Sequence, residues 1–189
     1  MNRWKNGVLY KSLTEGEIDL NLFEEFDRYQ EVKRCWRQVE GQWILKKIAF
    51  TEQWTDSDFE DLTMDLKNTV KTGGEVVGAF LNGMLAGFAS LENHFFGDHG
   101  EYLQLSSLHV SNKERGRGIG TELFSIMCRL AWEKGAKSLY ISAHSSEETQ
   151  RFYQNLGCSE STFKHKGLIE KEPFDCQLEM KLEQRFTRN

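Results

Sequence analysis

Apolar residues recur along the second half of the chain at two spacings, one typical of strands and one typical of helices. Strands are predicted over 75–81, 84–91, 102–110, 138–143 and 175–182. Asn82-Gly83 joins the first two strands as a tight hairpin, because this dipeptide readily takes positive φ angles. Helices are predicted over 118–134 and 146–155, with Gly135 and Gly157 placed to end them. This order of elements is typical of a domain of the α/β or α+β class.

The first half of the chain carries weaker signals for the same kinds of element. A strand, a helix and a hairpin are predicted in turn over 8–13, 17–29 and 31–50. The helix rests on apolar residues at helical spacing, and the hairpin rests on Glu40-Gly41 between two apolar and aromatic runs. Ser57-Asp58-Phe59-Glu60 has the form of a capping box, in which hydroxyl and carboxylate each satisfy a free backbone N–H group. The helix that begins there is predicted to stop at Gly73-Gly74.

Length and composition indicate one globular domain over 1–189, since the chain has 39% hydrophobic and 28% charged residues. Its 24 Lys and Arg against 29 Asp and Glu give a net charge of −5 without a basic block, which argues against nucleic-acid binding. No long apolar run or signal core is found, so we expect no membrane contact and a cytoplasmic protein. The 4 cysteines stand far apart, so we expect buried free thiols and no metal site.

The clearest chemistry lies between the strand 102–110 and the helix that follows it. This turn contains Arg115-Gly116-Arg117-Gly118-Ile119-Gly120-Thr121. Glycines leave backbone N–H groups uncovered and the helix dipole favours negative charge, so the turn suits a phosphate or pyrophosphate. The alternative is a tight turn with solvated arginines. A nucleotide P-loop is excluded because the chain has no Gly-Lys-Ser/Thr, and a dinucleotide fingerprint because it needs glycine where Thr121 stands.

Two motifs stand in register in this half of the chain. Arg115-x-x-Gly118-x-Gly120 has the form R/Q-x-x-G-x-G/A, and Phe152-Tyr153-Gln154-Asn155-Leu156-Gly157-Cys158 is close to F-Y-x-x-L-G-F. Both resemble the GNAT superfamily of acetyl-CoA-dependent N-acetyltransferases. The resemblance implies an α/β (α+β) GNAT fold, with a mixed central sheet of about seven strands, a splayed strand pair and about four flanking helices. It also implies an acetyl-CoA-binding core at about 75–182 and an acceptor-site segment at about 17–70.

The resemblance also implies roles for individual residues. Backbone groups of Leu108, His109 and Val110 would bind the pantetheine arm of acetyl-CoA as an added strand. Amides of Arg115, Gly116, Arg117, Gly118, Ile119, Gly120 and Thr121 would hold its pyrophosphate. Ser146 stands where the family often has an asparagine that touches the cofactor. Tyr153 matches the general acid that protonates the departing thiolate and would also contact acetyl-CoA, although without the motif it would be a half-buried helix aromatic.

The general base is left open by the sequence. Some family members carry a glutamate in the strand before the motif, and the corresponding residue here is Gln104, which accepts no proton from an ammonium ion. The remaining candidates are Glu92, Glu101, His109 and His144.

The function that the resemblance implies is transfer of an acetyl group from acetyl-CoA to a primary amine of a small molecule, by direct attack on the thioester. The acceptor pocket would lie at about 26–55 and 93–100, where Trp36, Trp43 and Trp54 with acidic residues would suit a cationic amine. Acetylation of a protein N-terminus or lysine is one alternative, and a non-catalytic acyl-CoA sensor is another. No metal is expected, and a homodimer is left open.

Overall fold

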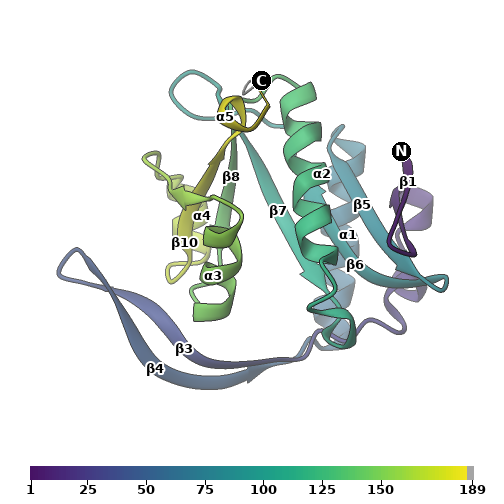
Figure 1. Ribbon diagram of the computed structural model, residues 1–189, viewed down its shortest axis with the longest axis horizontal. Helices are drawn as coiled ribbons and strands as arrows, with labels where there is room; N and C mark the ends of the chain where they lie inside the picture. The colour runs from purple at the N-terminus through teal and green to yellow at the C-terminus, as the bar shows by residue number, and fades with distance from the viewer. Residues whose placement is uncertain (187–189) are drawn as a thin grey trace.

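The computed structural model describes residues 1–186 and centres on an eight-stranded sheet (Figure 1). Its strands are β1 (Asn2–Lys5), β2 (Val8–Ser12), β5 (Glu75–Leu81), β6 (Met84–Leu91), β7 (Tyr102–Val110), β8 (Ser138–Ala143), β9 (Ser159–Glu160) and β10 (Cys176–Lys181). Their order across the sheet is β1-β2-β5-β6-β7-β8-β10-β9. All neighbouring pairs are antiparallel except β7 and β8, which run parallel. The predicted mixed sheet is therefore confirmed.

Strands β7 and β8 separate partway along their length. Parallel pairing joins Tyr102 to Ser138 and ends where Gln104 meets Tyr140. Beyond that point β7 continues to Val110, and no β8 residue pairs with this stretch. The edge of β7 that faces β8 is therefore open to an extended ligand that pairs as a strand does. The splayed pair that the resemblance implies is present.

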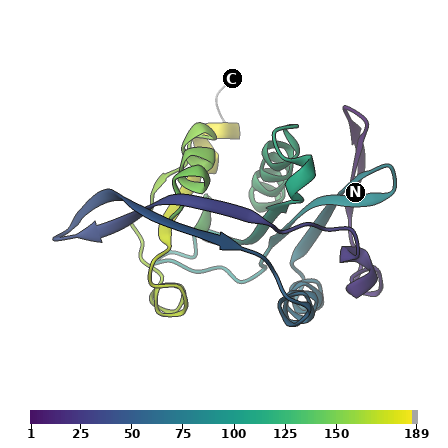
Figure 2. The same cartoon turned by 90° about the horizontal axis from the view of Figure 1, so that it is seen from below.

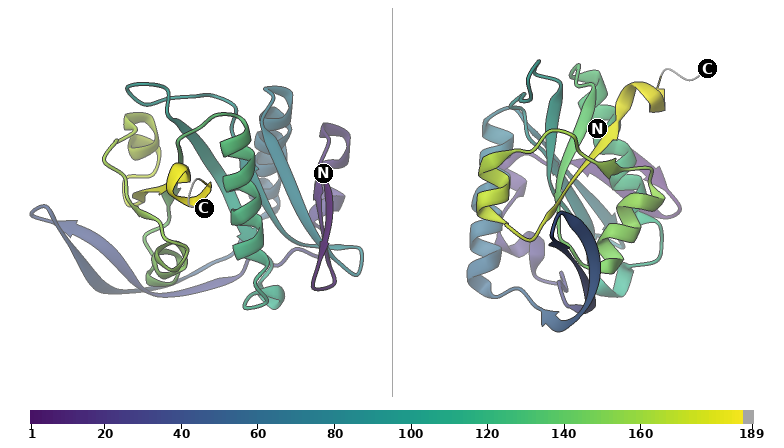
Figure 3. Two further views of the ribbon diagram at one scale, coloured as in Figure 1. Left: turned by 45° about the horizontal axis from the view of Figure 1, so that its top comes forward. Right: turned by 90° about the vertical axis from the view of Figure 1, so that its left-hand side faces the viewer.

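Helices cover both faces of the sheet (Figures 2 and 3). One face carries α2 (Ile119–Glu133) and α3 (Glu147–Asn155), and the other carries α1 (Asp56–Lys71) and α4 (Lys166–Lys171). The short α5 (Leu182–Phe186) follows β10. Leu123, Phe124 and Met127 of α2 are fully buried in the larger hydrophobic core. A smaller core on the α1 face joins Leu66 to Phe88 and to residues that precede the arm described next.

A two-stranded antiparallel arm stands apart from the main sheet. It consists of β3 (Gln30–Val39) and β4 (Gln42–Glu52), joined by Glu40 at φ 49° and Gly41 at φ 78°. The arm runs past the end of the sheet at which β7 and β8 separate (Figures 1 and 2). It contacts the loop before α3, where the Trp36 N–H donates to the Ser145 carbonyl at 2.8 Å. The predicted hairpin is thus confirmed, and its position relative to the splayed strands is a result of the structure.

The helix predicted over 17–29 is wrong. That stretch holds two short 3₁₀ helices, Glu15–Glu17 and Leu20–Phe23. Asp19 separates them in an extended conformation, and its side chain accepts a hydrogen bond from the Leu22 N–H. Ile18, Phe23 and Phe26 of the stretch are buried in the α1-side core, so their spacing reflects a demand for burial rather than a continuous helix.

Smaller differences concern element ends and short elements. The capping box of α1 is formed by Thr55 and Asp58 rather than by Ser57 and Glu60. Strands β1 and β9, helices α4 and α5 and a 3₁₀ turn at Asn112–Glu114 carried no recognisable signal. These elements are too short for periodicity to show.

All four cysteines are free and buried, as expected. Two of them, Cys158 and Cys176, line a cavity of about 270 Å³ between the arm, α3 and β10. Within residues 1–186, no helix has both the length and the apolar character that crossing a membrane demands.

Candidate functional site

A cavity of about 550 Å³ lies where β7 and β8 separate. Its walls come from β7, the turn that follows it, the start of α2, the end of β8, and α3. Among the residues predicted from the sequence, those that line it are Leu108, His109, Val110, Arg115, Gly116, Gly118, Ile119, Gly120, Thr121, His144 and Tyr153. Arg117 and Ser146 do not line it. The fold thus brings together residues from the two sequence motifs.

The turn before α2 is held open by glycines. Gly118 is the N-cap of α2 at φ 81°, and Gly116 has φ 77°, both in the left-handed region that glycine adopts without strain. A Cβ atom at either position would meet no atom within 4 Å, so the turn borders open space. Gly120 is different, because a Cβ atom there would lie 3.4 Å from Phe152 and Val110. The lack of a side chain at this position lets α2 pack close to these two residues. The N-terminus of a 15-residue helix thus faces one end of the cavity.

The two arginines of this turn differ in environment. The Arg115 Nε donates to the Val110 carbonyl at 3.2 Å, and burial together with Arg28 lowers the pKa of its guanidinium. The Arg117 side chain is 59% exposed and pairs with Glu114 at 3.2 Å. Arg115 therefore contributes positive charge to the cavity wall, and the Arg117 side chain lies outside it.

His109 occupies the face of β7 opposite Leu108 and Val110. Its ring packs against Trp54 at 4.7 Å and Phe88 at 5.4 Å between centroids. Burial, followed by the charges of Arg28 and Arg115, lowers the pKa of His109 to about 3. The imidazole is therefore neutral at physiological pH and is a weak proton acceptor.

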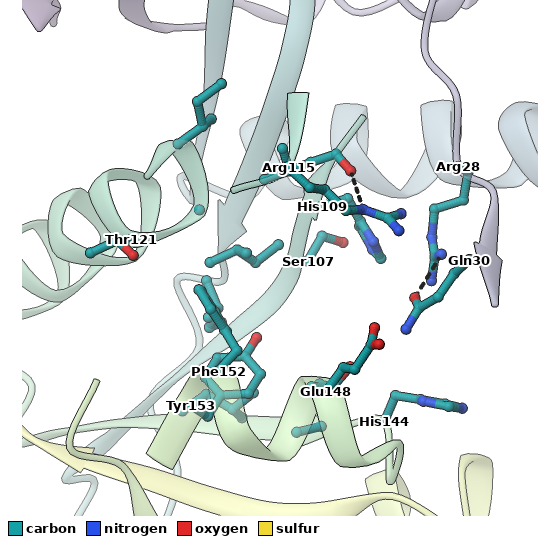
Figure 4. Close-up of a pocket in the computed structure, with 18 of the residues that line it drawn as sticks. Arg28, Gln30, Ser107, His109, Arg115, Thr121, His144, Glu148, Phe152 and Tyr153 are labelled. Atoms are coloured by element: carbon teal, nitrogen blue, oxygen red, sulfur yellow. Dashed lines mark hydrogen bonds between the residues drawn. The ribbon is translucent and has the colours of Figure 1, made fainter. Parts of the chain in front are cut away.

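Tyr153 projects from α3 into the cavity (Figure 4). The helix begins at Ser146, whose hydroxyl accepts a hydrogen bond from the Thr149 N–H, and it is followed by Gly157 at φ 91°. The tyrosine ring packs against Phe152 at 5.1 Å and Phe124 at 6.0 Å. Burial raises the pKa of the Tyr153 phenol above its ordinary value, so the phenol keeps its proton over the whole physiological range. A protonated hydroxyl of this kind is suited to donate to a leaving group.

The opposite end of the cavity is formed by side chains from three distant segments. The Arg28 guanidinium donates to Gln30 Oε1 at 3.1 Å and to Glu52 Oε2 at 3.2 Å, and it lies 5.1 Å from the centroid of Trp54. The other Glu52 oxygen lies 3.3 Å from His144 Nε2. Glu52, at the end of β4, thus links Arg28, which lies shortly before β3, to His144, which follows β8. The Arg28 side chain is only 11% exposed, and the Glu52 carboxylate neutralises its positive charge.

Glu148 faces the same end of the cavity. Its carboxylate projects from the first turn of α3 into the space between Tyr153 and Gln30 (Figure 4). No cation of residues 1–186 forms an ion pair with it within 4.0 Å, whereas neighbouring Glu147 pairs with both Arg34 and Arg151. A carboxylate that faces a cavity without a cationic partner favours a cationic ligand.

The residues at this end were missed by sequence reasoning. Arg28 and Gln30 lie within the segment 26–55 expected at the acceptor pocket, but neither they nor Glu148 belong to a motif. Glu52 does not line the cavity and contributes through its contact with Arg28. None of the three tryptophans expected at the acceptor pocket lines the larger cavity. Trp54 packs on His109, whereas Trp36 and Trp43 line the smaller cavity. The segment 93–100 does not line the larger one.

The candidate bases lie in four different settings. Glu101 accepts a hydrogen bond from the His99 N–H at 2.8 Å at the start of β7, and His109 is neutral. His144 accepts from the Ser146 N–H at 3.2 Å through Nδ1 while Nε2 faces Glu52, so both ring nitrogens are engaged. Glu92 accepts from Ser106, which lines the cavity. Within residues 1–186, no group of three His, Cys, Asp or Glu side chains is arranged to hold a metal ion.

Comparison with known proteins supplies a family and a set of similar structures. The family model described as the acetyltransferase (GNAT) family matches residues 29–158. No curated protein sequence matches the chain.

The similar structures share the fold at low sequence identity. Nourseothricin acetyltransferase superposes with a TM-score of 0.70 at 16% identity, over 94% of this chain and 99% of that chain. A candidate streptothricin acetyltransferase from Bacillus anthracis str. Ames, in complex with acetyl coenzyme A, gives 0.64 at 16% identity over 91% and 94%. A family acetyltransferase from Elizabethkingia anophelis with acetyl-CoA bound gives 0.58 at 18% identity over 94% and 99%.

Proposed function

The chain belongs to the acetyltransferase (GNAT) family, and from the geometry of its cavity we propose that it moves the acetyl group of acetyl-CoA to a primary amine of a small cationic molecule. The observation that carries this proposal is that one cavity has an end suited to an anion and an opposite end suited to a cation. One end offers a glycine turn at a helix N-terminus, and the other offers the Glu148 carboxylate without a cationic partner.

The residues of the cavity fit acetyl-CoA. The turn from Arg115 to Thr121 would receive the pyrophosphate, because a Cβ at Gly116 or Gly118 would point into open space and the helix dipole favours an anion. Leu108 and Val110 lie on the unpaired edge of β7, where the amides of the pantetheine arm would find backbone partners. Arg117 and Ser146 have less support for contact with acetyl-CoA, since neither lines the cavity and the Ser146 hydroxyl caps α3.

Bound acetyl-CoA would supply an acetyl group on a thioester whose thiolate is a fair leaving group, with a pKa of about 8.5. Tyr153 would protonate that thiolate, because its phenol stays protonated and points into the cavity. Glu148 would hold the ammonium form of the acceptor near the thioester. Once the ammonium has lost a proton, its nitrogen lone pair forms a C–N bond as the C–S bond breaks with its electron pair on sulfur, and the second nitrogen proton replaces the one that Tyr153 gives.

A small acceptor is favoured by the arm. The β3–β4 arm runs past the splayed strands and is joined to the α3 side through Trp36, Arg37 and Arg34, so it borders the acceptor end. A small molecule needs no more than the cavity, whereas a folded protein would have to approach past the arm. Two structures of the same fold are described as acting on nourseothricin and on streptothricin, so these compounds belong among the acceptors to test.

The test is a calorimetric titration with acetyl-CoA and with acetylpantetheine, which lacks the pyrophosphate, followed by a thiol-release screen. The screen would offer polyamines, aminosugars, nourseothricin, streptothricin and lysine-containing peptides. We expect binding that depends on the pyrophosphate and thiol release with a small cationic amine. Release with peptides alone would point to a protein acceptor, and binding without any release would point to an acyl-CoA sensor. Absence of binding would overturn the proposal.

A further inference from the structure

A hydroxyl network joins the cavity to the Glu92 carboxylate, which directly follows the neighbouring strand β6. Ser106 lies on β7 just beyond its last residue paired with β8, is exposed, and lines the cavity. Its Oγ donates to Glu92 Oε1 at 2.5 Å and lies 2.7 Å from the Ser90 Oγ. This is a direct hydrogen-bonded path from the cavity to a carboxylate outside its wall.

The hydrogen-bonding capacity of Ser106 leaves one site free. A serine hydroxyl has one proton to donate and two lone pairs that accept. The proton is directed to Glu92, and Ser90 occupies one lone pair when it acts as donor. The second lone pair is available to an N–H group of a ligand in the cavity, and none of the hydrogen bonds described for Ser106 uses it.

Glu92 is held in place without a counter-charge. Its backbone N–H donates to the Gln104 carbonyl at 2.9 Å, and its Oε1 also accepts from the Thr69 hydroxyl of α1 at 2.8 Å. No ion pair among residues 1–186 includes Glu92. Lys134, the residue that follows α2, bonds to neighbouring Asn93 and lies 4.0 Å from Glu75. The carboxylate therefore remains free to take up a proton.

The position of Ser106 along β7 is the third observation. The glycine turn follows the C-terminal end of β7, so an arm that enters there and pairs along Val110 and Leu108 runs back toward Ser106. The reacting carbon at the end of that arm would lie close to the point where β7 and β8 rejoin at Gln104 and Tyr140. This step rests on the proposed function.

The other titratable groups of the cavity are less suited to accept a proton. His109 has a pKa of about 3 and is packed between aromatic rings, and both ring nitrogens of His144 are engaged. Glu148 is the carboxylate to which the ammonium of the acceptor would bind, which is a different role.

We propose that Ser106 is the catalytic residue that accepts a proton from the acceptor amine, and that Glu92 acts through it as the positioning residue that takes up the hydroxyl proton. The ammonium loses one proton to Ser106 Oγ as the Ser106 proton passes to Glu92. The nitrogen lone pair then forms the C–N bond, and the C–S bond breaks with its electron pair on sulfur. The second nitrogen proton replaces the one that Tyr153 gives to sulfur. The products are the amide, the free thiol and one proton released to solvent.

The test compares Glu92→Gln and Ser106→Ala with the wild-type chain, using acetyl-CoA and a primary amine found in the thiol-release screen. At pH 7 we expect each variant to lower kcat about 100-fold. The deficit should shrink as pH rises toward the amine's own pKa of about 10, because a deprotonated amine needs no proton acceptor. The double variant should lose no more than either single one, since the two residues act as a unit. Ser106→Thr should restore most of the rate.

Binding and stability measurements separate this role from a structural one. Calorimetric affinity for acetyl-CoA and the unfolding midpoint should stay close to wild type in Ser106→Ala, and Glu101→Gln is the matched control whose kcat should not change. A loss that is independent of pH, a loss explained by weaker binding or unfolding, or wild-type kcat in both variants would overturn the relay. If the wild-type chain releases no thiol with any amine, the proposed function itself is overturned, and the relay with it.

Discussion

One end of the cavity is formed mainly by backbone groups, and the other is formed mainly by side chains. At the turn before α2, the working groups are backbone amides, shaped by glycines at positive φ and by a helix N-terminus. At the proposed acceptor end, the cavity is bordered by side chains, and Glu52 joins Arg28 to His144 there. Backbone groups recognise a common anion, whereas a side-chain network recognises one particular acceptor. The same architecture can thus keep its cofactor while its acceptor changes.

The largest effect is expected at the backbone-built end. Gly118→Asp places a side chain at φ 81° and a negative charge beside the proposed pyrophosphate site. Together these should raise the Kd for acetyl-CoA about 100-fold or more, as measured by calorimetry. Gly83→Asp is the matched control, because Gly83 has φ 82° and an open environment but lies in the β5–β6 hairpin. It should cost similar backbone strain and leave the affinity unchanged; equal affinity loss in both variants would contradict the assignment.

The next effect concerns Tyr153, which lies between the two ends. Tyr153→Phe should lower kcat about 100-fold while affinity for acetyl-CoA stays the same. Since burial raises the phenol's pKa, the wild-type rate should show no decline from ionisation of Tyr153 up to pH 10. Tyr10→Phe, which removes the hydroxyl of another buried tyrosine, should leave kcat unaltered. Unchanged kcat in Tyr153→Phe would remove the general acid from the mechanism.

A moderate effect is expected at the side-chain-built end. Glu148→Gln removes a negative charge from the cavity but keeps the shape of the side chain. We expect the KM for a cationic amine to rise about tenfold, which corresponds to one charge contact, with little change in affinity for acetyl-CoA. Glu147→Gln is the control in the same helical turn, because Glu147 faces Arg34 and Arg151 instead. If both variants raise KM equally, Glu148 acts through the general field of the helix rather than through contact.

This difference between backbone groups and side chains also explains which parts of the site could be predicted from the sequence. The turn from Arg115 to Thr121 is contiguous in sequence, and local backbone geometry or packing accounts for each of its glycines. The spacing of these residues was therefore enough to predict that the turn precedes a helix. Tyr153 was found for the same reason, since Ser146 and Gly157 mark the ends of its helix. The family's fold and its splayed strands followed from these motifs.

The acceptor end could not be predicted in this way. Arg28 and Glu52 are 24 residues apart, and their contact depends on how the arm pairs and where it docks. The helix expected over 17–29 failed because burial in the α1-side core imposes apolar positions without requiring helical hydrogen bonds. Ser106 carried no signal either, because its proposed role depends on a hydrogen bond to Glu92, which only the pairing of neighbouring strands brings close.

The smallest effect tests how firmly the arm is fixed to the catalytic core. Arg34 joins β3 to Glu147 of α3 through two hydrogen bonds of 2.7 and 2.8 Å, but half of its side chain is exposed. Arg34→Met should therefore lower the free energy of unfolding by no more than about 0.5 kcal/mol, after allowance for solvent screening. Denaturant unfolding at low and high salt would measure this loss, which should vanish at high salt.

The backbone contact at Trp36 explains why the expected loss is small. Its N–H donates to the Ser145 carbonyl, and Cys35 and Ser146 form a β-bridge, so the arm stays attached when the ion pair is removed. Lys33→Met is the control, because Lys33 is exposed and its nearest carboxylate is 3.9 Å away on Glu31. If Arg34→Met also raised the KM for the amine tenfold, the ion pair would set the arm's position over the cavity. The acceptor end would then depend on surface charge as well as on its own lining.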